Sequence, residues 1–429
     1  MALLPLLTFI ILYLAVSIVS GDFYKVPIAV AFLISSVVAI ATLRHYPIAQ
    51  RIKVFSRGAS SENMMLMVWI FILAGSFASS ANDMGSIDNT VSLALSLLPS
   101  KMLLAGIFLA ACFISLSVGT SVGTVVALVP IATGLAEETG VGVAMMTGAV
   151  VGGAFFGDNL SFISDTTVVA TQTQGCRMSD KFRANLALVT PAAVIIFLLY
   201  LFIGSEAAHT PEVGETDYLK VMPYLAIILL AAFGVNVMLV LTIGIVLTGV
   251  IGVYYGIYDI FGWMQSLSKG MMNVSELILV TMLAGGMLEV VRVNGGIDRL
   301  IHVITRHVKS RKGAEGAIAL LVTLVDFCTA NNTVAIITVG PIAREISERF
   351  AVDPRRAASI LDTFSCFAQG IIPYGAQLLM AGGLAMISPI EIIPCLFYPF
   401  AVGVIATLYI VFGKGKRRQE ALKSDGMGE

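Results

Sequence analysis

The chain has 429 residues, of which 57% are hydrophobic and only 12% are charged. A soluble domain carries about 25% charged residues, so this composition excludes a single soluble globular domain. The net charge of −1 provides no basic field that would attract nucleic acid. The apolar residues fall in segments long enough to cross a bilayer, and we expect an all-α polytopic membrane protein.

The N-terminal part predicts three crossings. Residues 3–20 and 26–43 are apolar and are predicted to span, and residues 64–80 cross outward. The connection 82–100 contains acidic but no basic residues, which suits the outer side. The positive-inside rule places the preceding loop, and with it the N-terminus, in the cytoplasm. The basic residues of that loop are Arg44, Arg51, Lys53 and Arg57.

Two interrupted segments follow. Residues 102–136 are broken by the glycine- and hydroxyl-rich stretch 117–124, and each arm is short for a crossing, so we expect a re-entrant hairpin. Residues 141–172 are predicted to form one discontinuous helix with its break at 157–165. The next loop contains Arg177, Lys181 and Arg183 and is predicted to be cytoplasmic. Residues 186–203 then form the last crossing of the first half.

The same order of segments recurs in the second half of the chain. Leu73–Ser76 matches Leu283–Gly286, and Pro130 matches Pro341. Each half contains an odd number of crossings, so the second half must be inverted, which agrees with the basic loop at 292–312. We expect about ten transmembrane helices, two re-entrant hairpins and two discontinuous helices, which is a secondary-transporter architecture. The predicted units are 1–211 and 212–413, the two inverted repeats, and 414–429, a basic cytoplasmic tail.

The stretch at 153–167, GAFFGDNLSFISDTT, contains two aspartates between long apolar segments. A carboxylate at membrane depth costs a few kcal/mol, so it is a candidate for function. A broken backbone at that depth requires cover from protein or from a water-filled cavity. We expect Asp158 and Asp165 to bind sodium as the carboxylates of one site.

The inverted halves are expected to bring two hairpin tips and two helix breaks to one centre. Carboxylate, amide, hydroxyl and carbonyl oxygens are the ligands that suit a hard cation, and half-helix N-termini favour an anion. The expected ion or substrate ligands are Thr120, Ser121, Thr124, Asp158, Asn159, Ser161, Ser164, Asp165, Thr166, Thr167, Asn331, Asn332, Thr333, Gln369, Tyr374 and Gln377.

Structural roles stay open for several of these residues. Asp165 could serve only as a helix cap, because Ser164 to Thr167 have good N-cap chemistry. Asn331 and Asn332 could only tie down a hairpin tip, and Asp158 could form only structural hydrogen bonds. Asp326 and Asp362 also fall within the membrane; each is predicted either to carry a proton or to pair with Arg355 or Arg356.

Other classes of function fit the sequence less well. The chain contains no Walker A pattern, so it shows no sign of ATP-driven transport. The Tyr258-Asp259 and Gly157-Asp158 pairs are in the wrong order for an intramembrane aspartyl protease, and Phe155 stands where that motif requires glycine. The five cysteines show no C-x-x-C spacing, and the four histidines give no metal pattern. A channel would not explain two inverted hairpins with different polar tips.

Residues 153–167 with the following QTQGCRMSDKFR, together with TANNTVAIITVG at 329–340 and AQGIIPYG at 368–375, resemble the NhaC-type sodium/proton antiporters of the ion-transporter superfamily. The resemblance implies sodium exchange against protons in a bacterial inner membrane, by an elevator-like movement and with no cofactor. It also implies that the ion-site residues are Asp158, Ser161, Ser164, Asp165, Thr166 and Thr167. Lipid and small ions are the implied partners. Scaffolds in such folds often form homodimers, but no motif here shows one.

Two positions depart from the pattern of that family. Asn159 stands where lysine is common, and Phe162 stands where proline is common. Loss of a lysine beside Asp158 removes a charge that could neutralise it, so the ion stoichiometry stays open. Because members of this broad group also move amino acids and malate or lactate, a cation-coupled carrier of an amino acid or small carboxylate is the alternative function.

Overall fold

The computed structural model describes residues 3–12, 27–97, 99–161, 164–207, 216–233, 235–306 and 308–413. Within these ranges the chain forms helices and no strands. The predicted first crossing at 3–20 is described only in part, as α1 (Leu4–Ile10). Residues 414–429, where a basic tail was expected, lie outside the described ranges, as do His209, His307 and Phe162.

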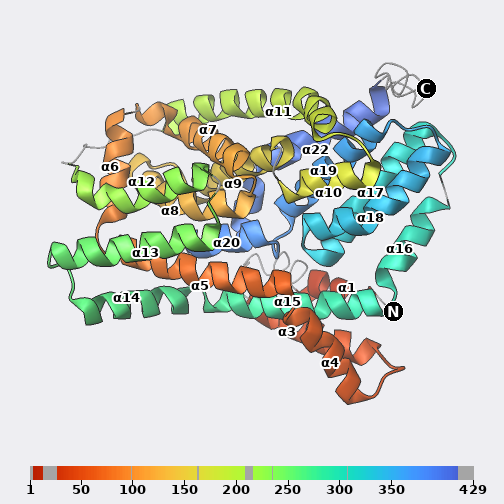
Figure 1. Cartoon of the computed structure of the whole chain (residues 1–429), viewed down its shortest axis with the longest axis horizontal. Coiled ribbons are helices and arrows are strands. Elements are labelled where there is room, and N and C mark those ends of the chain that lie inside the picture. The colour runs from red at the N-terminus through yellow and green to blue at the C-terminus, as the bar shows by residue number, and fades with distance from the viewer. Residues whose placement is uncertain are drawn as a thin grey trace.

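The helices up to residue 207 follow the expected order (Figure 1). They are α3 (Ile28–Thr42), α4 (Ile48–Ala59), α5 (Glu62–Asp83), α6 (Ser86–Leu97), α7 (Ser100–Val118), α8 (Ser121–Thr139), α9 (Val143–Leu160), α10 (Asp165–Gln174) and α11 (Met178–Ala207).

The helices from residue 218 onward are α12 (Tyr218–Ala232), α13 (Val237–Tyr254), α14 (Ile260–Asn273), α15 (Ser275–Val293), α16 (Gly296–Thr305), α17 (Arg311–Thr329), α18 (Asn332–Arg349), α19 (Pro354–Ile371), α20 (Ala376–Ala385), α21 (Pro389–Ile392) and α22 (Phe397–Phe412). The long helices α5, α13, α14 and α15 lie side by side along one edge of the molecule, and α7 to α11 lie with α17 to α22 on the other side (Figure 1).

Several helices are long and apolar enough to cross a bilayer. By length and composition the described residues contain five such helices, or up to eight if each strongly bent pair counts as one span. Three shorter apolar helices, within α3, α12 and α22, add to these. The chain is therefore a multi-pass membrane protein.

Some predicted loops contain helices. The basic loop after residue 43 includes α4, the predicted outer connection 82–100 includes α6, and the basic loop 292–312 includes α16. Each of these short helices mixes apolar residues with charged or polar ones. Such short amphipathic helices are hard to recognise when the basic residues are read only as a loop signal.

The breaks between paired helices are narrower than the sequence suggested. The expected interruption at 117–124 is only the turn between α7 and α8, at Gly119 and Thr120. Gly119 adopts a left-handed backbone with φ 72° and ends α7 within one residue. Ala330, with φ 49°, ends α17 in the same way before Asn331. The arms are consequently 19 residues long in α7, α8 and α17 and 18 in α18, longer than expected.

The discontinuous helices also begin and end differently. α9 continues through Asp158 to Leu160, and α10 begins at Asp165, so the start and the end of the predicted break 157–165 are helical. α19 continues through Gln369 to Ile371, and α20 begins at Ala376. Asp158 and Gln369 therefore each lie in the last turn of a helix, where backbone carbonyls have no partner within the helix.

Reciprocal packing brings the breaks and turns together. α10 packs against α18, and α20 packs against α8, while α9 and α19 contact each other. α9 also packs very closely on α7, because a Cβ at Gly157 would lie 2.3 Å from the Cβ of Ser115. Small residues that permit such close approach are typical of helix packing in membranes. The end of α9 is thereby fixed beside both turns.

Candidate ion-binding centre

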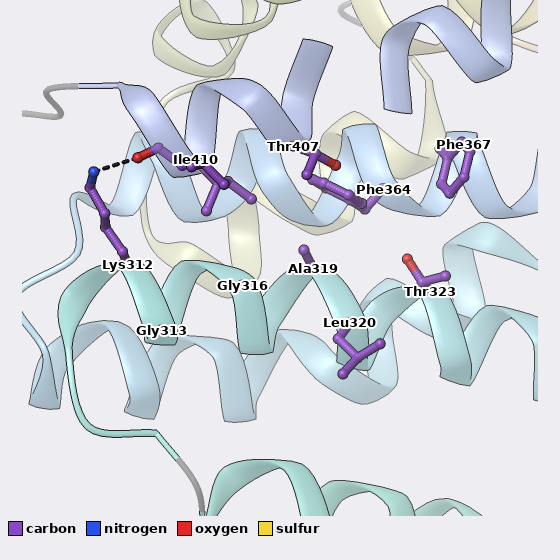
Figure 2. A pocket seen from close by; sticks show the side chains of 11 residues that line it. Lys312, Gly313, Gly316, Ala319, Leu320, Thr323, Phe364, Phe367, Thr407 and Ile410 are labelled. Atoms are coloured by element: carbon purple, nitrogen blue, oxygen red, sulfur yellow. Dashed lines mark hydrogen bonds between the residues drawn. The ribbon is translucent and has the colours of Figure 1, made fainter. Parts of the chain in front are cut away.

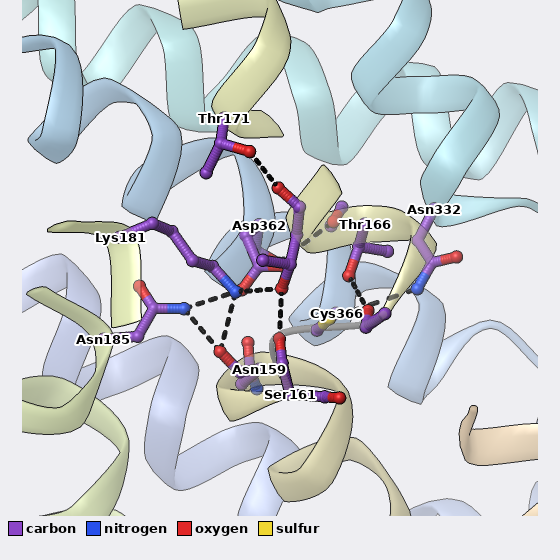
Figure 3. Close-up of polar contacts among 12 residues, drawn as sticks. Asn159, Ser161, Thr166, Thr171, Lys181, Asn185, Asn332, Asp362 and Cys366 are labelled. Carbon is purple, nitrogen blue, oxygen red and sulfur yellow. Dashed lines mark hydrogen bonds and ion pairs between the residues drawn. The ribbon is translucent and has the colours of Figure 1, made fainter. Parts of the chain in front are cut away.

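The end of α9 and the start of α10 form a buried polar centre (Figure 3). The buried residues of these two segments are Asp158, Asn159, Ser161, Ser164, Thr166 and Thr167. Two side chains from α11, Lys181 and Asn185, and one from α19, Asp362, complete it. Below, "the polar centre" means these nine residues.

Asp158 is linked to the second half of the chain by a series of hydrogen bonds. The Ser121 hydroxyl donates to Asp158 Oδ2 at 2.5 Å, and Gln377 Nε2 donates to Ser121 Oγ at 2.9 Å. Gln369 Nε2 in turn donates to Gln377 Oε1 at 2.9 Å and to the Ala330 carbonyl at 3.2 Å. We call these three hydrogen-bonded side chains, the Ser121 hydroxyl and the amides of Gln377 and Gln369, the amide chain. It joins both interhelical turns to both broken helices.

Lys181 is the buried cation of the polar centre. Only 1% of its side chain is exposed, and Nζ lies 2.9 Å from Asp362 Oδ2. Nζ also donates to the Asn159 carbonyl at 2.8 Å and to Thr167 Oγ1 at 2.6 Å. The Asn159 carbonyl is free to accept because α9 ends at the next residue, and a cation at a helix C-terminus is favoured by the helix dipole. Lys181 thus holds the break of α9 to α19.

Lys181 and Asp362 form a pair that the sequence did not predict. Lys181 was expected to lie in a cytoplasmic basic loop, and Asp362 was expected either to carry a proton or to pair with Arg355 or Arg356. Instead Asp362 accepts from Lys181 and, at 2.7 Å, from Asn185 Nδ2.

The arginines pair elsewhere, Arg355 with Asp353 and Arg356 with Glu315. The arginines lie about two turns, roughly 10 Å, from Asp362 along α19, which is too far to pair. Lys181 and Asn185 are four residues apart and therefore lie on one face of α11. That spacing was the sequence signal that could have identified them as two donors to the same group.

Asp165 differs from Asp158 in burial. It is exposed in the first turn of α10, whereas Asp158 is 5% exposed. Ser164 occupies the N-cap position of α10 but makes no capping hydrogen bond with its side chain; its hydroxyl contacts Thr166 Oγ1 at 2.7 Å. The two aspartates that were expected to share one ion are therefore separated by the break.

The turn residues fall into two groups. Ser121 reaches the polar centre, whereas Thr124 bonds back to the Thr120 carbonyl within its own helix. Asn331 caps α18 by accepting from the Val334 amide at 2.9 Å, so its side chain acts in the turn itself.

Three further expected ligands are placed as follows. Asn332 is buried and approaches Cys366, and Thr333 is half-buried beside it. Tyr374 donates to the Phe327 carbonyl at 2.7 Å and packs edge-on against Phe9 and Phe32, which is a packing position.

Several buried oxygens near the polar centre lack a hydrogen-bond donor among the described residues. They are Asn159 Oδ1, Asn185 Oδ1, Asp362 Oδ1, Gln369 Oε1 and both carboxylate oxygens of Asp326. A buried acceptor without a donor costs about 1–3 kcal/mol. Oxygens of this kind are suited to binding a cation. Among the described residues, no three His, Cys, Asp or Glu side chains come together, so hydroxyl, amide and carbonyl oxygens would supply most ligands of such a cation.

A cavity of about 630 Å³ lies elsewhere, between α17, α19 and α22 (Figure 2). Its lining is mostly apolar, including Gly316, Leu320 and Phe364, and Lys312 at one end donates to the Val411 carbonyl. None of its lining residues belongs to the polar centre. A cation would gain few ligands there, so the chemistry of the oxygens rather than the size of the cavity identifies the candidate site.

An all-helical, strongly apolar chain with interrupted helices and a buried polar centre defines a polytopic membrane transporter. The Na+/H+ antiporter family matches residues 1–205 and 212–414, and the chain belongs to this family. This confirms the resemblance that the sequence motifs carried and places the chain among antiporters rather than enzymes.

Three relatives illustrate the range of the family. The chain is 25% identical to the Na+/H+ antiporter NhaC of Bacillus subtilis over 80% of its own length and 83% of that protein. It is 24% identical to NhaC of Alkalihalophilus pseudofirmus, covering 79% and 80%. It is also 24% identical to the malate-2H+/Na+-lactate antiporter of Bacillus subtilis, covering 74% of each chain.

Proposed function

We propose that this protein exchanges sodium for protons across the bacterial inner membrane as a secondary active transporter. The observation that carries the proposal is Asp158, a buried carboxylate at a helix end, linked through Ser121 and Gln377 to both halves of the chain. Carboxylate and hydroxyl oxygens at such a break can bind sodium, and the same carboxylate can bind a proton instead.

The charges of the polar centre favour an exchange of one cation for another. Asp158 and Asp362 supply two negative charges, and Lys181 supplies one positive charge. One sodium ion or one proton at Asp158 would neutralise the one negative charge that remains. Movement of the empty, charged centre through the membrane is costly because desolvated charge is expensive. Only the loaded forms would then move readily, and this restriction couples the two ions.

We place the sodium at Asp158, with Ser121 as a further ligand and Asn159 Oδ1 as an acceptor that has no donor among the described residues. Asp165, exposed in the first turn of α10, is placed outside this site in the described conformation. In this proposal the site is surrounded by the hydroxyl residues of the break, which are Ser161, Ser164, Thr166 and Thr167. In this proposal Lys181 supplies the positive charge that is absent from position 159.

We further propose that two inverted repeats, 1–211 and 212–413, move the centre by an elevator-like motion, with both termini in the cytoplasm. Matching helix lengths support the duplication: α9 and α19 have 18 residues each, and α10 and α20 have 10 each. The two stretches that match the family, 1–205 and 212–414, are separated close to the proposed boundary. The hairpins α7–α8 and α17–α18 would travel with the broken helices they contact.

Sodium-induced proton flux in proteoliposomes tests the proposal. Purified protein is reconstituted with a pH-sensitive dye inside the vesicles, and a sodium pulse is applied outside. We expect the vesicle interior to become alkaline, because sodium enters in exchange for internal protons, and we expect no change in empty vesicles. Absence of flux across the neutral and alkaline range would contradict sodium/proton exchange.

A carrier of a small carboxylate or amino acid is the second candidate. The relative that exchanges malate and protons for sodium and lactate favours it, as does an arginine/ornithine antiporter of Halobacterium salinarum, 22% identical over 347 residues. Uptake of labelled malate, lactate or arginine in the same vesicles decides between the two. Uptake that depends on a sodium or proton gradient would favour this second function.

A further inference from the structure

Asp326 is a third fully buried carboxylate, and it lies outside the polar centre. It is 0% exposed in the last turn of α17, four residues before Ala330. Neither of its carboxylate oxygens has a hydrogen-bond partner among the described residues, although the main-chain amides of Asn331 and Gln369 face it. By contrast, Asp158 accepts from Ser121, and Asp362 accepts from Lys181 and Asn185.

No cation from the protein neutralises this carboxylate. No ion pair between described residues includes Asp326, and the titratable side chains around it are Cys328, Cys366 and Tyr374. A buried charge without a partner is strongly unfavourable, so an ionised Asp326 requires a cation from outside at this position, and without one its carboxyl group is protonated.

Other oxygens belong to residues that adjoin Asp326. The Gln369 amide donates to the Ala330 carbonyl at 3.2 Å, and Gln369 Oε1 has no donor among the described residues. Two carboxylate oxygens, one amide oxygen and one carbonyl oxygen form a set of ligands that suits sodium. They come from the α17–α18 turn and from the end of α19, whereas the Asp158 ligands come from the α8 and α9 ends.

We propose that Asp326 and Gln369 bind a second sodium ion, separate from the one at Asp158. The inference rests on the proposed sodium exchange and extends it to the number of ions. Asp158, Asp362 and Asp326 carry three negative charges against the one positive charge of Lys181, so two monovalent cations would neutralise this set of side chains. The amide chain of Ser121, Gln377 and Gln369 connects the two sites, so binding at one site alters the orientation of the ligands at the other.

Equilibrium binding of radioactive sodium to the purified full-length protein tests this inference. We expect about two ions per chain in the wild type and about one in Asp326→Asn, which keeps the shape and removes the charge. Asp158→Asn should also bind about one. Glu276→Gln, which removes an exposed carboxylate from α15, is the matched control and should bind as the wild type does.

Each outcome bears on the inference. One ion per wild-type chain, or two in Asp326→Asn, would overturn it. If Asp326→Asn does not fold, as judged by gel filtration, Gln369→Met is the variant to test in its place. It leaves the carboxylate unchanged and should weaken binding of the second sodium ion several-fold.

The proton is the competing occupant of Asp326. If a proton stays on Asp326 instead, the wild type binds one sodium ion and releases no more protons on sodium addition than Asp326→Asn, and this result would also overturn the inference. Failure of the proposed exchange appears separately, as absence of sodium-induced proton flux in wild-type vesicles.

Discussion

Two charged side chains of opposite sign, Asp158 and Lys181, lie on either side of the break in α9. Neither is exposed by more than 5%, and neither pairs with the other directly in the described contacts. Asp158 is oriented by a neutral hydroxyl, whereas Lys181 is held by a carboxylate and by a helix-terminal carbonyl. Their roles therefore differ: Asp158 is available to a transported cation, and Lys181 is committed to the structure of the break.

Asp158→Asn tests the first role. Removal of the charge leaves Ser121 a hydrogen-bond acceptor but removes the group that binds sodium or the proton. We expect sodium-induced proton flux to fall by tenfold or more, a loss of about 1.4 kcal/mol or more. Flux is measured in proteoliposomes that contain equal amounts of protein. Full sodium-dependent exchange in this variant would remove Asp158 from the site.

Lys181→Met tests the second role. It leaves Asp362 buried with only uncharged donors such as Asn185, so we expect a loss of stability of about 3–5 kcal/mol. The double variant Lys181→Met with Asp362→Asn removes both charges and should regain much of that stability. Thermal unfolding in detergent measures the comparison. Equal unfolding temperatures for the single and double variants would show that the ion pair does not stabilise the break.

At the scale of elements, the contact between α7 and α9 determines where Asp158 lies. Gly153 and Gly157 face α7 so closely that a Cβ at either would lie within 2.6 Å of α7 atoms. Ser115 on α7 also donates to the Ala154 carbonyl. A bulkier residue at position 157 would push the last turn of α9 away from Ser121, which is on the helix that follows α7.

Gly157→Ala is therefore expected to be destabilising. The added methyl group meets Ser115 Cβ and Oγ and the Leu116 amide, and overpacking of this kind costs about 1–3 kcal/mol. We also expect weaker sodium binding, because Asp158 and Ser121 move apart. Gly142→Ala is the matched control at the start of the same helix, where an added Cβ has no neighbour within 4 Å. Equal stability of the two variants would argue against a close α7–α9 contact.

At the scale of the whole molecule, the broken helices and their hairpins contact a separate group of long helices that includes α5 and α15. α20 packs against both of these. If transport proceeds by an elevator-like motion, α20 must slide along α15 in every cycle. The contact is close, since a Cβ at Gly383 would lie 2.1 Å from Leu277 Cδ1 and 3.2 Å from Leu277 Cγ.

A disulfide across this contact tests the motion. Cysteines that replace Leu277 and Gly383 would lie near the roughly 3.5–4.5 Å Cβ separation that a disulfide requires. In a background with Ser at positions 176 and 395, the two partly exposed cysteines, oxidation should abolish exchange and reduction should restore it. Each single cysteine variant serves as a control. Undiminished exchange after complete cross-linking would contradict sliding at this contact.

The sequence alone determined the class of protein and the location of the most informative stretch. Apolar segments of spanning length and acidic residues within them were sufficient for an all-helical membrane transporter, because burial cost and hydrogen-bond demand act on local composition. Antiport was implied by the resemblance of the motif at 153–167 to the NhaC-type family. The order and the approximate bounds of α5 and of α7 to α11 could also be predicted from the same patterns. The positions of the breaks did not, since left-handed residues such as Ala330 carry no clear sequence signal.

The tertiary structure decided which charges meet. Lys181 is sequentially part of a basic stretch with Arg177 and Arg183, and only the packing of α11 against α9 and α19 turns it inward to Asp362. The packing of α20 against α8 joins Ser121 to Gln377 across 256 positions, and the fold leaves the Asp326 side chain without a partner among the described residues. Contacts between residues so far apart in sequence depend on how helices approach one another, and local patterns carry little information about that approach.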